Sequence, residues 1–369
     1  GIQCAGGIVT GIYTTDAASQ LAYIVNDSGA KFLFLENDEQ LDKYLEVRDQ
    51  MPGLVKVIVF DPEGLHDFRD PNVIFIEDLY ALGRQELVRQ PKRFEQEIDA
   101  SKPDDIAILI YTSGTTGMPK GCIHTQRDML YTAGTSLAAS FQLSPDDVVL
   151  NFVPIFWIAG EDTGLLFPLV AGATLVLMAR WDAVGFMTAV ERHKASFAYL
   201  LVDNAVEILD HPRTPFFDLT SLRKVRVSSF VKKLNPDFRA RWRALTGADM
   251  IEAAWGMTET HTMDSFTIDD FDLLSQPVFV GLPVPGTDFK ICDFDSGALM
   301  PLGETGEICV RTPSLFKGYW NKPEASAEAI RNGFLHTGDI GVIDEQGYLH
   351  FLGRRKEMLK VKGMSVFPA

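Results

Sequence analysis

The chain has 369 residues and a net charge of −16. This length exceeds one ordinary compact domain and predicts two or more lobes. The acidic balance argues against a nucleic-acid-binding surface, because such surfaces carry a basic patch. The most apolar stretch, 165–178, is broken by Pro168 and Gly172, so no transmembrane segment is expected. Widely separated cysteines without metal-ligand spacing favour free thiols in a reducing, cytoplasmic compartment: Cys4, Cys122, Cys292 and Cys309.

Residues 1–102 alternate helix-like and strand-like segments, which predicts part of a first α/β subdomain. The polar segment 84–102 is interpreted as a surface connection into the next unit. The predicted elements are a helix over 20–28, with Gly29 near its C-cap, and buried parallel strands at 31–35 and 55–60.

Residues 103–275 are expected to form a second α/β subdomain, an open sheet covered by helices, whose first strand runs into a Gly/Thr loop. Residues 276–353 have short strands between Gly/Pro/Asp turns, which predicts a small β-rich subdomain, a distorted barrel. The fold class is therefore α/β: two packed α/β subdomains with largely parallel sheets, plus the β-rich part. Strands are expected at 106–110, 148–152, 174–178, 224–227, 250–254, 288–293, 307–311, 340–343 and 348–352, and helices at 184–194 and 236–245.

The most informative segment is the loop Tyr111-Thr-Ser-Gly-Thr-Thr-Gly-Met-Pro-Lys-Gly121. It follows a strand, which places it at the carboxyl edge of a sheet, where ligands of α/β folds bind. Its glycines let backbone N–H groups approach an anion, its four hydroxyls add donors, and Lys120 adds a positive charge. The segment predicts a triphosphate cradle, although no Gly-Lys-[Ser/Thr] ends it as in a Walker A loop.

This loop resembles the signature loop of adenylate-forming enzymes, a family that includes acyl-CoA synthetases such as fatty-acid–CoA ligases, firefly luciferase and the adenylation domains of peptide synthetases. The resemblance continues in order along the chain. The matching segments are Trp255-Gly-Met-Thr-Glu-Thr260, Gly303-Glu-Thr-Gly-Glu-Ile-Cys-Val-Arg311, Gly318-Tyr-Trp-Asn-Lys322, Thr337-Gly-Asp339 and Gly353-Arg-Arg-Lys-Glu-Met-Leu-Lys-Val-Lys-Gly363.

The resemblance implies an ATP- and Mg²⁺-dependent adenylation site in which Lys120, Thr258 and Glu259 are catalytic. Thr258 is expected to contact the α-phosphate, and Glu259 to bind the Mg²⁺. Trp255 is expected to stack on adenine in place of the usual Tyr; Asp339 and Arg354 would bind the ribose hydroxyls. The nucleotide-binding residues implied in this way are Thr112, Ser113, Gly114, Thr115, Thr116, Gly117, Lys120, Ala254, Trp255, Gly256, Met257, Thr258, Asp339 and Arg354. Taken singly, Trp255 also fits a core residue, Glu259 a helix-start charge, Asp339 a turn former and Arg354 a solvated base.

The acyl pocket departs from the family pattern at two positions. Trp157 stands where relatives usually carry His, and Phe230 replaces a Gly of the pocket floor. Ile158 and Gly160 are expected to line the same pocket. An α-amino acid substrate is disfavoured, because neither Phe156 nor Trp157 pairs with an ammonium group, although Glu161 and Asp162 follow closely. Lys232 and Lys233 fit solvated charges, or one of them contacts an acidic substrate or a phosphate.

Residues 354–369 resemble the hinge and the start of a small C-terminal domain, with Lys356 at the hinge and Lys362 and Gly363 on the coenzyme A side. Because the chain starts in mid-pattern at Gly1 and stops within this region, we expect a piece of a longer protein. The resemblance implies an acyl-CoA synthetase acting on a small carboxylic acid with coenzyme A, and allows a homodimer. The alternatives are a ligase that loads a carrier protein and a catalytically impaired nucleotide-binding homologue.

Overall fold

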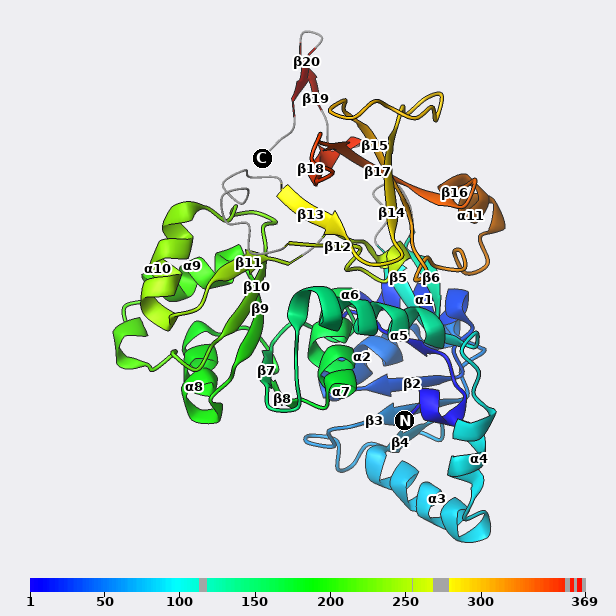
Figure 1. The fold of residues 1–369 in the computed structure, drawn as a ribbon. Coiled ribbons are helices and arrows are strands. Elements are labelled where there is room, and N and C mark those ends of the chain that lie inside the picture. Colours follow the sequence, from blue (N-terminus) through cyan, green and yellow to red (C-terminus); the bar gives the residue numbers. More distant parts are fainter. Residues whose placement is uncertain (113–117, 254, 268–278, 356–358, 362–363, 367–369) are drawn as a thin grey trace. The chain divides into compact units, whose positions relative to one another are not determined.

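The computed structural model describes residues 1–112, 118–253, 255–267, 279–355, 359–361 and 364–366. The chain forms two compact units (Figure 1). Unit 1 comprises Gly1–Gln126 and Lys317–Pro323, and unit 2 comprises Arg127–Phe316 and Glu324–Ala369. The predicted boundary after residue 102 thus falls inside unit 1, and the strand expected at 106–110 belongs with the N-terminal segments.

Unit 1 contains two three-stranded sheets. In one sheet β2, β3 and β4 are parallel; in the other β1 is parallel to β5, and β5 is antiparallel to β6. Apolar side chains of α1 and α2, such as Leu21 and Leu41, share one core with Val57 of β3. The elements are η1 (Gln3–Ala5), β1 (Val9–Thr10), α1 (Ala18–Ser28), β2 (Phe32–Leu35), α2 (Asp38–Val47), η2 (Arg48–Gln50), β3 (Lys56–Val59), β4 (Val73–Phe75), α3 (Ile76–Arg89), α4 (Arg93–Ala100), β5 (Ile106–Thr112) and β6 (Lys120–Thr125).

Most elements predicted for this region are confirmed. The helix expected over 20–28 is α1, which ends at Gly29 in the left-handed conformation (φ 70°), and the strands expected at 31–35 and 55–60 are β2 and β3. The segment 84–102 differs from the expectation of a plain connection, since α3 and α4 occupy most of it. Neither helix buries a residue, and their polar composition led to the interpretation as a connection.

Unit 2 is built on a five-stranded parallel sheet in the order β11-β10-β9-β7-β8. Helices α8, α9 and α10 lie on one side of it and α6 and α7 on the other (Figure 1). Helix α10 begins where the Asn235 side chain accepts a hydrogen bond from the Phe238 backbone N–H at 2.9 Å. The elements are α5 (Gln126–Ser136), η3 (Leu137–Phe141), β7 (Val148–Asn151), α6 (Ile158–Glu161), η4 (Asp162–Leu166), α7 (Phe167–Ala171), β8 (Thr174–Leu177), α8 (Ala183–His193), β9 (Phe197–Leu201), α9 (Val202–Asp210), η5 (Thr214–Phe216), β10 (Lys224–Ser228), α10 (Pro236–Thr246), β11 (Met250–Glu252) and η6 (Thr258–Thr260).

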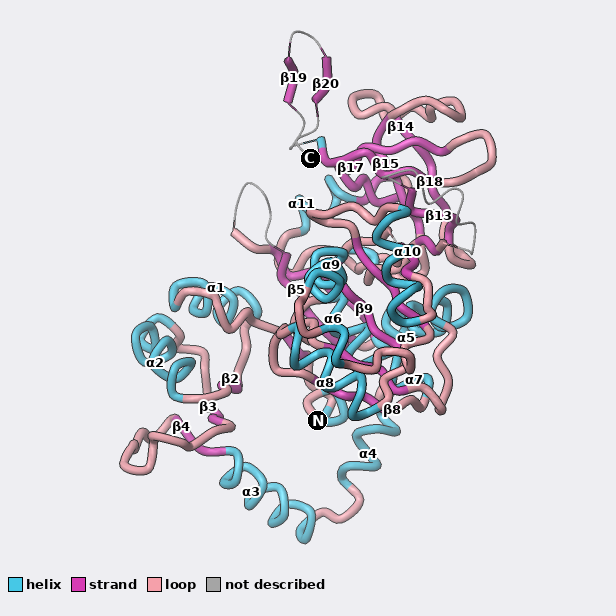
Figure 2. Tube along the Cα trace, turned by 90° about the vertical axis from the view of Figure 1, so that its left-hand side faces the viewer, coloured by secondary structure: helices cyan, strands magenta, loops and turns pink. Residues whose placement is uncertain are grey.

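The rest of unit 2 is an antiparallel sheet in the order β12-β13-β18-β17-β15-β14, with β16 paired to β17. These strands gather at one end of unit 2, apart from its helical layers (Figures 1 and 2). The predicted α/β class with a β-rich part is therefore confirmed. The elements are β12 (Ser265–Phe266), β13 (Phe279–Pro283), β14 (Asp288–Cys292), β15 (Gly306–Arg311), α11 (Pro323–Ala329), β16 (Ile330–Arg331), β17 (Phe334–Ile343), β18 (Leu349–Arg354), β19 (Leu359–Val361) and β20 (Met364–Val366). Among the helices of the described residues, none combines the length and apolar character that a bilayer span requires.

Candidate active site

In unit 1, β5 and β6 hold the flanks of the Gly/Thr loop. The strands pair with Thr112 opposite Lys120, and the Tyr23 hydroxyl of α1 donates to the Pro119 carbonyl at 2.8 Å. The loop follows the carboxyl end of β5, as expected, but it leads into an antiparallel strand instead of a helix. The other predicted phosphate-binding residues lie outside the described residues: Ser113, Gly114, Thr115, Thr116 and Gly117.

Asp27 of α1, which sequence reasoning missed, joins this hairpin to the segment 317–323. Its carboxylate accepts a hydrogen bond from the Tyr111 hydroxyl at 2.8 Å and pairs with Lys322 Nζ at 3.2 Å. Its backbone carbonyl accepts from Trp320 Nε1 at 3.0 Å. Burial, followed by the hydrogen bond to Asp27, raises the pKa of Tyr111, so the phenol remains a donor. No motif contains Asp27, and only the folded structure reveals its role.

The segment Gly318–Lys322 lies along β6, so two of the predicted motifs meet in unit 1. The Ile123 N–H donates to the Gly318 carbonyl at 3.1 Å, and the Trp320 N–H donates to the Gly121 carbonyl at 2.7 Å. Lys120 Nζ lies 4.0 Å from the centroid of the Tyr319 ring, a cation–π contact. Tyr319 of this motif thus contacts the side chain of Lys120, which is predicted to bind phosphate.

In unit 2, three predicted nucleotide-binding residues meet although they are far apart in sequence. Trp255 Nε1 donates to Asp339 Oδ2 at 3.2 Å, and Arg354 Nε lies 2.9 Å from Asp339 Oδ1. Asp339 is 3% exposed and Trp255 is 5% exposed, and the Trp255 and Phe289 rings pack edge-to-face with centroids 5.4 Å apart. The binding of ribose hydroxyls by Asp339 stays a prediction. Little of the Trp255 ring is exposed, so its stacking on adenine stays a prediction.

Glu307 supports the part of β17 that carries Asp339. Its carboxylate accepts from the Gly338 backbone N–H at 3.0 Å and lies 2.7 Å from His336 Nδ1. Cys309 Sγ is 3.4 Å from the same ring nitrogen. The residue belongs to the segment 303–311 that resembled the family, but the resemblance implied no role for it. Through these contacts Glu307 fixes the segment of β17 next to Asp339.

Thr258 and Glu259 lie in the short helix η6, and Glu259 is 8% exposed. The Glu259 carbonyl accepts from the Phe316 backbone N–H at 2.8 Å. Gly256 is needed for close packing, because a Cβ on it would lie 2.5 Å from the Met263 backbone nitrogen. Met257 precedes η6, and its carbonyl accepts from Thr262 N–H at 2.9 Å. Ala254 lies outside the described residues.

The two bulky residues of the predicted acyl pocket contact each other. The ring centroids of Trp157 and Phe230 are 6.1 Å apart. Phe230 is 57% exposed, so this ring is not part of the core. Ile158 and Gly160 are buried in α6 instead. A Cβ on Gly160 would lie 2.0 Å from the Pro154 carbonyl oxygen, so this glycine allows α6 to pack on the chain after β7.

The segment around Phe230 is organised by Glu252 at the end of β11. Its carboxylate accepts from the Ser229 N–H at 2.9 Å and from the Ser229 hydroxyl at 2.6 Å. Lys233 Nζ donates to the Ser229 carbonyl at 3.0 Å, and the Lys232 N–H donates to Asp203 at 3.2 Å. Both lysines are exposed, which fits solvated charges. The predicted hinge residue Lys356 and the predicted coenzyme A-side residues Lys362 and Gly363 lie outside the described residues.

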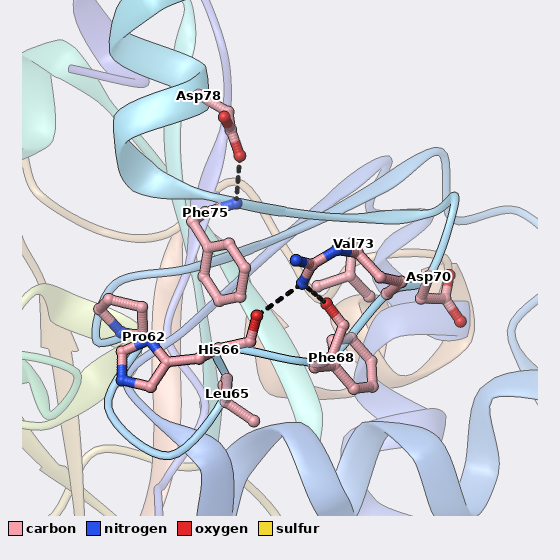
Figure 3. A pocket seen from close by; sticks show the side chains of 9 residues that line it. Pro62, Leu65, His66, Phe68, Asp70, Val73, Phe75 and Asp78 are labelled. Carbon is pink, nitrogen blue, oxygen red and sulfur yellow. Dashed lines mark hydrogen bonds between the residues drawn. The ribbon is translucent and has the colours of Figure 1, made fainter.

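A cavity of about 390 Å³ lies in unit 1, and none of the predicted site residues lines it (Figure 3). The polar groups that line this cavity form hydrogen bonds within the surrounding loop. Arg69 donates to the carbonyl oxygens of His66 and Phe68 at 2.8 and 2.6 Å, and Asp78 accepts from the Phe75 N–H at 3.1 Å. The cavity is therefore a feature of the loop between β3 and β4.

The convergence of Trp255, Asp339 and Arg354 agrees with the comparison to known proteins: residues 1–320 match the family model described as AMP-binding enzyme. The chain belongs to the AMP-binding enzyme family. 4-Coumarate–CoA ligase 1 of Solanum tuberosum is 34% identical over 285 residues, which cover 74% of this chain and 52% of that protein. The long-chain-fatty-acid–CoA ligase of Bacillus subtilis (strain 168) is 30% identical over 269 residues, covering 72% and 46%.

The solved structure of an anthranilate CoA ligase in complex with anthranoyl-AMP superposes with a TM-score of 0.81 and 26% identity. The match covers 100% of this chain and 67% of that one. The chain spans about half the length of the curated relatives it matches. The family and its fold are thus established.

Proposed function

We propose that the protein activates a carboxylic acid with ATP and transfers the acyl group to coenzyme A. In the first step a carboxylate oxygen attacks the α-phosphorus, the bond from that phosphorus to the β-phosphate bridge breaks, and pyrophosphate leaves. In the second step the coenzyme A thiol gives up its proton, forms a thioester with the acyl carbon and displaces AMP. The Trp255–Asp339–Arg354 cluster carries the proposal, because these residues were each predicted to bind adenosine and meet in unit 2.

Adenylation of this kind depends mainly on positioning and on neutralising phosphate charge. In our proposal Lys120 binds the β- and γ-phosphates, Thr258 binds the α-phosphate, and Glu259 holds Mg²⁺. A single carboxylate oxygen completed by phosphates and waters suits this hard octahedral ion. The Glu259 carboxylate fits the ion chemically, and Asp339 is proposed to accept from the ribose hydroxyls.

For the acid, we infer a short or medium-length chain or a compact aromatic ring without an α-amine. Trp157 and Phe230 support this choice, since two large rings in contact occupy volume where relatives carry smaller groups. Glu161 and Asp162 are not available to an α-ammonium group from solvent, because they are 4% and 0% exposed. The similar proteins named for 4-coumarate and anthranilate act on aromatic acids by their names, whereas the Bacillus subtilis relative is named for long-chain fatty acids.

The test is product analysis by mass spectrometry on the full-length protein that contains residues 1–369. The protein receives ATP, Mg²⁺ and a panel of acids, with and without coenzyme A. We expect AMP and an acyl-CoA from at least one compact acid. Acyl-AMP that accumulates without thioester would favour a carrier-protein acceptor, and no acid-dependent AMP at all would contradict the proposal. The cytoplasmic location, the homodimer and the domain boundaries stay predictions.

A further inference from the structure

The chain leaves the Thr258–Glu259 segment through an unusual turn. His261, Thr262 and Met263 have φ values of 58°, 50° and 58°, so three consecutive residues with side chains are left-handed. Only glycine, and to a lesser extent Asn and Asp, adopts this conformation without strain. Strained backbone of this kind persists only where the surroundings over-determine it, and it concentrates at functional sites.

Local hydrogen bonds account for part of the constraint. The Thr262 N–H donates to the Met257 carbonyl at 2.9 Å, and the Asp264 N–H donates to the Trp255 carbonyl at 2.9 Å. The Thr260 hydroxyl donates to the buried Asp264 carboxylate. These bonds close the turn on itself. Its two ends are also held, since the Glu259 carbonyl accepts from the Phe316 N–H at 2.8 Å and the Asp264 carbonyl accepts from the Val284 N–H at 3.0 Å.

The side-chain attachment of the turn to α6 and η4 comes from a buried cluster of His261, Glu161 and Asp162, which are 0%, 4% and 0% exposed. His261 Nδ1 lies 3.5 Å from Asp162 Oδ1, and His261 Nε2 lies 3.9 Å from Glu161 Oε2. Both oxygens of Asp162 lack a hydrogen-bond partner among the described residues, so the carboxylate depends on the imidazole for compensation. Burial raises the pKa of both carboxyl groups, and Glu161 raises that of Asp162 further.

The arrangement favours a bridging imidazole over a metal ion. The ligand atoms of the three residues lie within 4.8 Å of one another, which alone is compatible with a cation. However, the two carboxylates face opposite ring nitrogens, whereas an ion binds one nitrogen and needs both carboxylates beside it. An imidazole that lies between the two carboxylates, with one ring nitrogen toward each, matches the observed placement.

The two carboxylates sit where the helix changes its geometry. Glu161 ends α6, and Asp162 begins η4, a π-helical turn of the kind often found at functional sites. Trp157 and Ile158, predicted to line the acyl pocket, stand at the beginning of the same helix α6. The cluster therefore connects the turn that follows Glu259 to the helix that follows Trp157.

We propose that His261 is a positioning residue: clamped between Glu161 and Asp162, it holds the strained turn and thereby sets the position of Thr258 and Glu259 relative to the helix of the acyl pocket. This inference rests on the proposed function and deepens it. Neither His261 nor the two carboxylates contacts substrate; they act through the backbone that carries Thr258 and Glu259.

The experiment compares His261→Asn with wild type in the full-length protein. Asn tolerates the left-handed conformation but is too short to reach both carboxylates. We expect acid-dependent ATP–pyrophosphate exchange to lose at least tenfold in kcat, while KM for ATP changes less than threefold. The matched control is His350→Asn, which removes another His–carboxylate pair of unit 2, in which a buried imidazole lies 2.7 Å from the partly exposed Asp344 carboxylate. His350→Asn is expected to lower the melting temperature. It is not expected to lower kcat selectively over KM for ATP, as His261→Asn does.

A double-mutant cycle with Glu161→Gln gives a second measure. A clamp predicts that the double variant is no slower than the slower single variant, because one interaction is removed only once. Additive losses, or exchange unchanged in His261→Asn, would overturn the proposal. One divalent ion per chain in elemental analysis, lost in Asp162→Asn, would overturn it in favour of a metal site.

The clamp is also testable without catalysis, which separates its failure from failure of the proposed function. Amide hydrogen exchange over 258–264 reports the turn directly. We expect protection there to fall at least tenfold in His261→Asn and to stay unchanged in His350→Asn. If wild type shows no exchange with any acid but this difference persists, the function is wrong and the clamp stands. Unchanged protection would overturn the clamp itself.

Discussion

The phosphate-loop region of unit 1 and the Thr258–Glu259 region of unit 2 are held by different physical means. In unit 1 an antiparallel hairpin is tied by Asp27 to partners that are partly exposed, such as Lys322 at 40%. In unit 2 a strained turn is attached by charges that are almost fully buried. Exposed polar ties contribute little each, whereas breaking a buried charged pair leaves a desolvated charge. Unit 2 is therefore expected to respond more strongly to small substitutions.

The largest effect is expected at Gly160. Gly160→Ala places a Cβ 2.0 Å from the Pro154 carbonyl oxygen, so α6 must move. We expect a loss of about 3 kcal/mol in the free energy of unfolding. The control is Gly134→Ala in α5, where nothing lies within 4 Å of the new Cβ. Alanine there is neutral or stabilising, because it is the better helix former. Equal urea midpoints for the two variants would show that α6 packs less tightly than described.

The next effect concerns Asp147, a buried carboxylate of unit 2 that accepts from Ser196 at 2.7 Å and pairs with Arg223 and Lys224 at 3.0 and 3.2 Å. Asp147→Asn is expected to cost about 2 kcal/mol, measured by urea unfolding at pH 7. Burial alone would raise the pKa of Asp147, but hydrogen bonds from Ser196, Ser144 and Lys224 lower it below the ordinary value.

The sign of its pH dependence follows from that lowered pKa. The stabilisation from Asp147 is fully present above the ordinary carboxyl pKa and is lost as the pH falls through the lower pKa of the folded state. The stability difference between wild type and Asp147→Asn should therefore shrink in acid. A difference that grows below pH 4 would contradict this assignment.

The third prediction concerns activity and compares one residue from each region. Lys120→Ala and Glu259→Gln are each expected to lower the adenylation rate at least tenfold, about 1.4 kcal/mol of transition-state stabilisation. Pyrophosphate exchange in the full-length protein measures both. Near-unchanged exchange in either variant would remove that residue from the mechanism.

The smallest effect is expected at Asp27. Asp27→Asn keeps the size of the side chain but weakens the bonds to Tyr111 and Lys322. We expect a loss of about 1 kcal/mol in stability, visible as a lower urea midpoint. Asp42→Asn on the exposed side of α2 is the matched control and should change little. If Asp27→Asn lowered stability as much as Asp147→Asn, the expected difference in sensitivity between unit 1 and unit 2 would be contradicted.

The sequence predicted the regular parts of the fold better than the irregular ones. The parallel strands β7, β8, β10 and β11 were all predicted; the runs of β7 and β8 are mainly apolar, whereas β10 alternates apolar and polar residues. The strand β6 was missed, because its first residues, Lys120 and Gly121, were interpreted as the end of the loop. Helix α4 was missed, because its polar composition was interpreted as a surface connection.

In the candidate site, too, some residues could be predicted from the sequence and others could not. Trp255, Asp339 and Arg354 stand in ordered motifs, so their resemblance to a family identified them before they were seen to meet. Asp27, Glu307 and the partners of His261 act through contacts between segments that are distant in sequence. Such contacts have no periodicity or spacing, and only the folded chain brings them together.

One measurement tests the central claim most directly: acid-dependent ATP–pyrophosphate exchange by the full-length protein, for wild type and Asp339→Asn. Our account predicts exchange with at least one compact acid in wild type, and at least tenfold lower kcat/KM for ATP in the variant, whose amide no longer offers two acceptor oxygens. Absence of exchange with every acid of the panel, or exchange that Asp339→Asn leaves intact, would contradict it.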